Sequence, residues 1–177
     1  MAKTTLYIDY HDEIDSTHYD ERYLNQVIEH TLSVMSSKLN AGVSFAYFDN
    51  AAEYWHQSKT LDIYITDTNE GRQLNLDARG KDYATNILSY PSELPPDVLE
   101  MMGELPLGEL IICHDVVVRE AAEQNKTFKH HLTHLVVHGI LHLLGFDHEI
   151  SDADANEMEG FEIEILAGLG INNPYQV

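Results

Sequence analysis

The feature of this sequence that most constrains its fold is a strongly apolar segment, residues 128–144, that carries several histidines and is followed by Gly145. Apolar residues at this density and spacing predict an α-helix. Gly145 is placed to end it, because glycine readily adopts the left-handed conformation found at helix C-termini. His138 and His142 lie one turn apart near the end of this helix, and His148 follows three residues after Gly145. The segment therefore predicts a helix that brings histidines together at its C-terminal end.

The rest of the chain alternates between strand-like and helix-like patterns. Strands are expected at residues 4–9, 61–68, 85–91 and from 108, and helices at 20–39, 70–78, from Asp115, and at 152–169. Residues 42–48 read as a strand or as an irregular connection, and the proline-containing stretch 92–106 reads as a loop. This order predicts one α/β (α+β) domain spanning residues 1–177, with a small mixed β-sheet flanked by helices.

Composition excludes several classes of protein. The chain has 177 residues, of which 44% are apolar and 23% charged, which is typical of a globular protein and not of a disordered or fibrous one. The single cysteine, Cys113, allows no intramolecular disulfide and no cysteine-rich zinc module. The first twenty residues contain no apolar core of a secretory signal, and no apolar run is long enough for a membrane helix. We expect a soluble, cytoplasmic protein with no membrane partner.

The spacing of His138, His142 and His148 predicts a metal site. Two histidines four residues apart on a helix face the same way, and a chain reversal at Gly145 can return His148 as a third ligand. Three nitrogen ligands with an open fourth position are typical of catalytic zinc, which lowers the pKa of a bound water to about 7. The alternative, three buried histidines satisfied only by hydrogen bonds, is less consistent with this spacing.

The other histidines fit the same ion poorly. His134 lies about 12 Å along the helix from His142 and is interpreted as a supporting or packing residue. His114, His130 and His131 are weaker candidates still; they lie outside the motif. The spacing also matches the HExxHxxGxxH motif of zinc peptidases, but Gly139 occupies the position of their catalytic glutamate. A peptidase mechanism would therefore lack its general base.

Four blocks of sequence resemble one family. They are LNLDARGKDYATNILSYP (74–91), LGELIIC (107–113), HGILHLLGFDH (138–148) and NEMEGFEIEILAGLGINNPY (156–175). In order and spacing they are similar to the bacterial YbeY family over about residues 61–175. The resemblance implies a single α/β domain and a zinc-dependent, single-strand-specific endoribonuclease. It also implies roles in rRNA maturation, including the 16S 3′ end, and in ribosome quality control.

The resemblance also assigns residues. The family's metal ligands fall on His138, His142 and His148, and its invariant arginine, which is thought to contact RNA phosphate, falls on Arg79. The substrate-binding stretch implies contacts from Lys81, Asn86 and Ser89, with Asp82 and Thr85 near the cleft. Tyr90 and Glu109 depart mildly from the family pattern, and residues 40–60 resemble an insertion without an assigned role. The implied partners are single-stranded RNA and the ribosome or its proteins.

Several alternatives stay open. The attacking group is either hydroxide or the RNA 2′-hydroxyl, and Glu109 is a candidate distant base or a structural residue. Asp147 either orients a ligand histidine or is exposed. The chain could instead be a ribosome assembly factor whose zinc only stabilises the fold, or a metallohydrolase acting on a small phosphoester or amide. The net charge of −20 opposes RNA binding, so we expect weak, salt-dependent affinity centred on Arg79.

Overall fold

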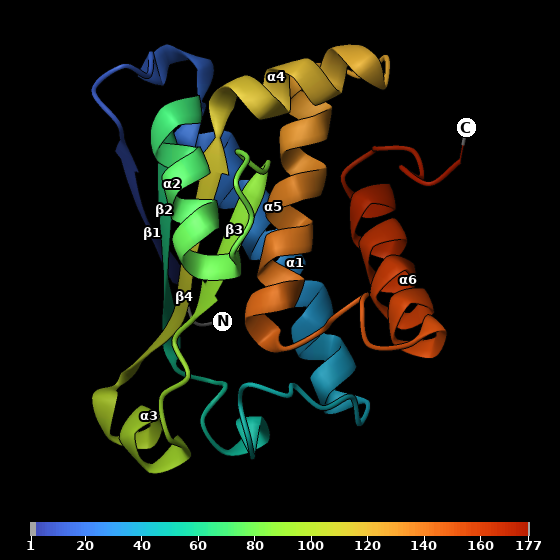
Figure 1. The fold of residues 1–177 in the computed structure, drawn as a ribbon. Coiled ribbons are helices and arrows are strands. Elements are labelled where there is room, and N and C mark those ends of the chain that lie inside the picture. The colour runs from blue at the N-terminus through green and yellow to red at the C-terminus, as the bar shows by residue number, and fades with distance from the viewer. Residues whose placement is uncertain (1–2, 177) are drawn as a thin grey trace.

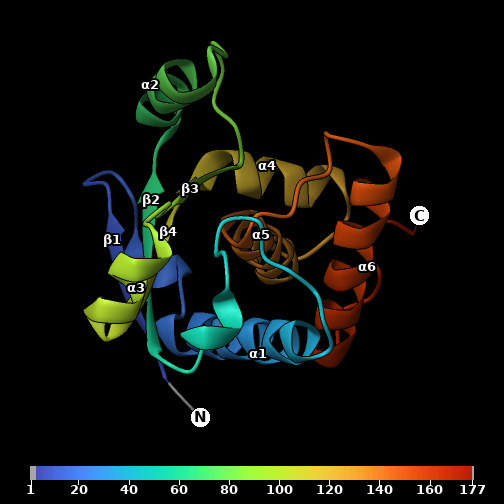
Figure 2. The same cartoon turned by 90° about the horizontal axis from the view of Figure 1, so that it is seen from below.

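The apolar segment forms helix α5 (Phe128–Leu144), which lies between the sheet and the outer helix α6 (Figures 1 and 2). The computed structural model describes residues 3–176. α5 packs on β3 (Ile87–Pro91) and β4 (Glu104–Cys113) on one side, and on α1 (Glu21–Asn40) and α6 (Asp152–Gly168) on others. A helix that is apolar around most of its circumference is stable only when it is covered in this way.

The sheet is four-stranded and mixed, as predicted. Its order is β1-β2-β4-β3, with β1 (Thr4–Tyr10) and β2 (Ser58–Thr66) completing the set. β1, β2 and β4 run parallel, whereas β3 pairs antiparallel with β4 and forms one edge of the sheet. Because β3 lies beside α5, its outer edge borders the helix that carries the histidines.

The remaining helices connect the strands to one another or, for the last of them, connect β4 to α5. They are α2 (Thr68–Arg79), α3 (Pro96–Met102) and α4 (His114–Glu123). Short 3₁₀ turns cover Ser16–His18 and Ala51–Glu53. α6 packs on α5 and α1 rather than on the sheet, so it forms an outer layer (Figure 2). Within residues 3–176, no helix combines the length and the apolar composition required to cross a membrane.

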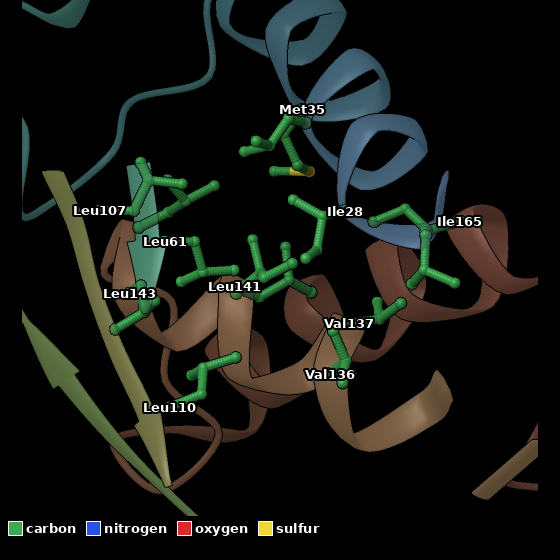
Figure 3. Close-up of a cluster of buried hydrophobic side chains, with 14 of the residues drawn as sticks. Ile28, Met35, Leu61, Leu107, Leu110, Val136, Val137, Leu141, Leu143 and Ile165 are labelled. Atoms are coloured by element: carbon green, nitrogen blue, oxygen red, sulfur yellow. The ribbon is translucent and has the colours of Figure 1, made fainter. Parts of the chain in front are cut away.

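The core is built from aliphatic side chains of α1, α5 and the two central strands (Figure 3). Ile28 and Met35 of α1, Leu61 of β2, and Val137 and Leu141 of α5 are all fully buried or nearly so. Each such side chain contributes roughly 1.5–3 kcal/mol through removal of apolar surface from water. This packing fixes α5 against the sheet and therefore fixes where its histidines lie.

The structure decides between two predictions for one region and corrects the prediction for another. Residues 42–48 form an irregular connection and not a strand, because Phe45 and Phe48 anchor it by pointing inward while the chain turns between them. Residues 92–106 are not simply a loop: they contain α3 and the start of β4. Pro96 is accepted in the first turn of α3, where no backbone N–H is needed. Pro106 lies in β4 next to a register shift against β2, a position where proline is tolerated.

Candidate metal centre and the cleft around it

His138 and His142 of α5 and His148 of the following loop converge on one point. Their ligand nitrogens all lie within 4.8 Å of one another. The ring centroids form a nearly equilateral triangle, with separations of 4.5, 5.1 and 5.2 Å. The Nε2 atoms of His138 and His142 are 2.9 Å apart and face each other. The structure therefore brings together the three histidines that the sequence spacing selected.

Gly145 creates the reversal that returns His148. Its φ of +108° is in the left-handed region, and its N–H donates to the carbonyl of His142 at 3.0 Å. The next residue, Phe146, donates to the carbonyl of Leu141, and its ring is buried. A Cβ at position 145 would lie 2.7 Å from the Cβ of Ala46, so glycine is required by packing as well as by conformation.

A buried carboxylate, Glu162 of α6, lies behind the triad. It is fully shielded from solvent. Its Oε1 accepts a hydrogen bond from Nδ1 of His138 at 2.8 Å, and its Oε2 accepts from Nε2 of His134 and from the hydroxyl of Tyr175, both at 2.7 Å. When Nδ1 of His138 carries the proton, Nε2 keeps its lone pair and faces His142. Glu162 therefore orients His138 toward the other two histidines.

The ionisation states suit a cation between the three rings. Burial opposes ionisation of Glu162, but the hydrogen bonds from His134 and His138 outweigh it and lower the pKa of the carboxyl to about 2. Burial, followed by the neighbouring His138 and His148, lowers the pKa of His142 to about 4. His142 is therefore neutral at pH 7 and its ring can act as a ligand.

The donor set fits zinc or a similar borderline metal, since three imidazoles converge and face solvent on one side. His134, His138 and Glu162 form a second cluster with ligand atoms close together. That cluster shares His138, and both oxygens of Glu162 already accept hydrogen bonds. Its arrangement is that of a support for His138 and not of a separate ion site, which agrees with the interpretation of His134 from its spacing.

The triad opens onto a cleft of about 560 Å³. One wall is the edge of β3 with the residues before it, and another is the loop after α5. The lining residues that matter below are Tyr47, Arg79, Asn86, Ser89, Asp147 and the three histidines. A cleft of this volume has room for a small ligand or for a short part of a polymer beside the triad.

Arg79, the last residue of α2, reaches this cleft with an exposed side chain. The carboxylates that could have paired with it are engaged elsewhere. Asp82 forms a bidentate pair with Arg72, at 2.7 and 2.9 Å, and Asp77 accepts from Gln73. Within residues 3–176, no ion pair involves Arg79. A free guanidinium near the triad is suited to bind a phosphate.

The other predicted substrate contacts divide into two groups. Ser89 and Asn86 line the cleft, but the Asn86 side chain already donates to Glu120 at 2.9 Å and accepts from the Ile87 N–H. Lys81 is exposed and lies outside the residues that line the cleft. Its contact with substrate stays a prediction.

The structure also places Thr85 and three carboxylates that the sequence analysis named. Thr85 lines the cleft, whereas Asp82 lies outside it in the pair with Arg72. Asp147 lines the cleft and accepts from the backbone N–H of Glu149 at 2.8 Å. Glu162, and not Asp147, makes the hydrogen bond that orients a histidine of the triad. Glu109 lies on β4, where burial and then Asp62 raise the pKa of its carboxyl, and it is not among the cleft residues.

Three functional candidates were missed from the sequence. Glu162, the buried carboxylate of α6, is not among the residues predicted for the site. A signal existed, because Glu162 falls at helical spacing between Met158 and Ile165, both buried. Tyr175 and Tyr47 carried no such signal, since each meets the site only through the tertiary fold.

Comparison with known proteins gives consistent results. The family model described as Endoribonuclease YbeY matches residues 9–170. A protein named Endoribonuclease YbeY from Psychrobacter cryohalolentis is 60% identical over 151 residues, covering 84% of this chain and 97% of that one. The protein of the same name from Psychrobacter arcticus is 65% identical over 136 residues, covering 76% of this chain and 66% of its own length. The solution structure of TM1509 from Thermotoga maritima has a TM-score of 0.50 at 23% identity over 98% of this chain and 97% of that one, a similarity of fold alone.

Proposed function

The chain belongs to the YbeY family of endoribonucleases, and we propose that it is a zinc-dependent enzyme that hydrolyses phosphodiester bonds in single-stranded RNA. The observation that carries the proposal is the convergence of His138, His142 and His148 in a cleft that also holds the unpaired Arg79. A metal triad and a free guanidinium together match a scissile phosphate, which carries negative charge on two oxygens.

Each residue has a distinct part in this proposal. A bound zinc ion would supply Lewis-acid charge and a water of lowered pKa. His138, His142 and His148 hold the ion, and Glu162 keeps Nε2 of His138 free for it. Arg79 binds the non-bridging oxygens of the phosphate and stabilises the charge that develops there. The attacking group is either hydroxide or the 2′-hydroxyl, and a 2′,3′-cyclic phosphate end would identify the latter.

Position 139 argues against a peptidase. Gly139 faces the sheet, where an added Cβ would lie 2.8 Å from Leu110 and 2.9 Å from Ile87. A glutamate there would clash with both of these side chains. The helix therefore has no room for the general base of HExxH peptidases at that position, which favours phosphodiester over amide chemistry.

The finer proposal concerns the cellular role. By family resemblance, the substrate is rRNA, including the 3′ end of 16S rRNA, and the setting is ribosome maturation and quality control in the cytoplasm. We propose that residues 1–177 act as one such domain. The charge of −20 supports a role for the ribosome or a ribosomal protein in positioning the enzyme, because the protein alone has little cationic surface to attract RNA.

The first test is cleavage of a labelled single-stranded RNA by the wild type and by His142→Ala. Wild type is expected to cut the single strand and to spare the same RNA annealed to its complement. His142→Ala is expected to lose at least 100-fold in rate, an order-of-magnitude figure for removing metal-derived charge stabilisation. Chelation should abolish wild-type cleavage, and added Zn²⁺ should restore it.

His130→Ala is the matched control, because His130 lies on the same helix but is exposed and outside the cleft. Equal cleavage by His142→Ala and wild type would assign the activity to a contaminating nuclease. If neither protein cuts free RNA or ribosomes, the alternative of a zinc-stabilised assembly factor replaces the enzyme. In that case chelation should lower stability and ribosome binding together.

A further inference from the structure

Tyr47 is an exposed aromatic residue in the segment 45–55, whose other aromatic residues are buried. Its side chain is 42% exposed. The neighbouring aromatics are almost fully covered: Phe45 at 2%, Phe48 at 2%, Tyr54 at 0% and Trp55 at 7%. The segment thus has enough apolar contacts to fold without burying Tyr47, which stays partly exposed and lines the metal cleft.

The segment holds Tyr47 in a fixed place. Phe45 packs edge-on against Trp55, with ring centroids 5.0 Å apart, and against Phe146, at 6.1 Å. The backbone N–H of Tyr47 donates to the carbonyl of Leu144, the last residue of α5, at 3.3 Å. The absent side chain of Gly145 leaves room for this close crossing. Tyr47 is therefore anchored to the helix end that carries the triad.

Tyr47 also belongs to a second, smaller hollow. The metal cleft has a volume of about 560 Å³, and the smaller hollow, lined partly by Leu94, Pro95 and Pro96, has a volume of about 270 Å³. Tyr47 lines both. A polymer that extends from the metal cleft into the smaller hollow would therefore pass Tyr47.

We propose that Tyr47 stacks on an unpaired nucleobase of the RNA and thereby positions the phosphate at the triad, an inference that rests on the proposed function. Base–aromatic stacking tolerates any sequence and does not depend on cationic groups, which suits an acidic protein with few phosphate contacts. Bases inside a duplex are already stacked on their neighbours, so only a single strand can offer one to Tyr47. Tyr47 is thus a substrate-binding residue that contributes to single-strand specificity.

The decisive variants are Tyr47→Ala and Tyr47→Phe. Tyr47→Ala should raise KM for single-stranded RNA on the order of 10-fold, in the range that loss of one stacked base produces, with little change in kcat. Tyr47→Phe keeps the ring and should keep the wild-type KM. Tyr7→Ala is the matched control, since Tyr7 is 54% exposed on β1 and lies outside the cleft. An unchanged KM in Tyr47→Ala, or a Tyr47→Phe variant as impaired as Tyr47→Ala, would overturn the proposal.

A binding measurement separates this inference from the enzyme proposal. Oligoribonucleotides with 2-aminopurine at successive positions are titrated with chelator-treated protein, so that no hydrolysis takes place. Wild type and Tyr47→Phe should quench the fluorescence at one position or a short run of positions, and Tyr47→Ala should not. If Tyr47-dependent quenching is seen but the metal-loaded protein cleaves no RNA, the stacking proposal is supported and the proposal of an endoribonuclease is contradicted. If the metal-loaded protein cleaves RNA but no quenching depends on Tyr47, the stacking proposal is contradicted and the proposal of an endoribonuclease is supported.

Discussion

At the scale of single residues, the carboxylate of Glu162 controls how His138 faces the cleft. Glu162→Gln keeps the size of the side chain but removes its charge and one of its two acceptor oxygens. We expect the Zn²⁺ affinity to fall about 10- to 100-fold, the usual effect of losing a carboxylate that orients a metal-binding histidine. Competition with a chromophoric chelator measures the affinity. Glu157→Gln, an exposed carboxylate on the same helix, is the control.

A spectroscopic measurement distinguishes orientation from mere stability. In ¹⁵N NMR of the metal-free protein, His138 should be protonated at Nδ1 in the wild type and should populate both tautomers in Glu162→Gln. If the variant unfolds at lower temperature but keeps both the wild-type tautomer and the wild-type Zn²⁺ affinity, Glu162 serves stability alone and its positioning role is refuted.

The sequence predicts the three histidines of the triad much better than it predicts Glu162, the carboxylate that orients His138. His138, His142 and the turn at Gly145 are local features, so helical spacing and glycine conformation were enough to bring His148 into the set. Glu162 lies 24 residues beyond His138 on another helix, and its partnership depends on how α6 packs. Spacing along the chain contains no information about that packing, although a carboxylate on an apolar helix face was a usable signal.

At the scale of elements, the end of α5 depends on glycine. Gly145→Ala should lower the free energy of unfolding on the order of 2 kcal/mol, because φ is +108° and the new Cβ would press on Ala46 and on the backbone N of Tyr47. Gly160→Ala is the control within α6, where an added Cβ has no neighbour within 4 Å. That variant should gain roughly 0.5–1 kcal/mol from the better helix propensity of alanine.

Urea unfolding followed by circular dichroism measures both changes. Both variants replace glycine by alanine, so changes of opposite sign in the free energy of unfolding reflect the local backbone conformation and packing and not a general effect of the substitution. If the Gly145→Ala protein is as stable as the wild type, the segment around Ala46 and Tyr47 can move away from the end of α5. The claim that Tyr47 is held in a fixed position would then be wrong.

Element prediction succeeded where one physical signal dominated. The 3.6-residue period placed α1, α5 and α6 within about two residues of their ends, and β-forming residues located the four strands. α3 was missed because consecutive prolines indicate a loop, yet they also begin a helix well. The fold of residues 42–48 could not be read locally, because Phe45 and Phe48 are held by Trp55 and Phe146, which lie elsewhere in the chain.

At the scale of the whole molecule, the net charge is −20, whereas the cleft contains the cationic side chain of Arg79. Repulsion between RNA and the acidic protein and attraction between RNA phosphate and Arg79 both depend on salt. The contribution of Arg79 is therefore measured as the difference in salt dependence between the wild type and a variant without this charge. Arg79→Gln should make the slope of log affinity against log salt less negative by about 0.7, the value for one phosphate contact on a single strand. Fluorescence anisotropy with a labelled oligonucleotide between 50 and 200 mM salt, about the usual range for such titrations, gives the slopes.

The control for that measurement is Arg119→Gln, since Arg119 is exposed and lies outside the cleft next to Glu123. It changes the net charge by the same amount and should leave the slope unaltered. Equal slopes for all three proteins would mean that Arg79 does not contact phosphate.

The hydrogen bond between His138 and Glu162 has a consequence for biosynthesis. α6 is made after α5, so a growing chain displays the histidines of α5 before it contains the carboxylate that orients one of them. Tyr175, which completes the set of donors to Glu162, is made later still. A chain that has been made only as far as α5 therefore carries two of the three histidines without the carboxylate that orients His138, and the metal centre is complete only after α6 and Tyr175 have been added.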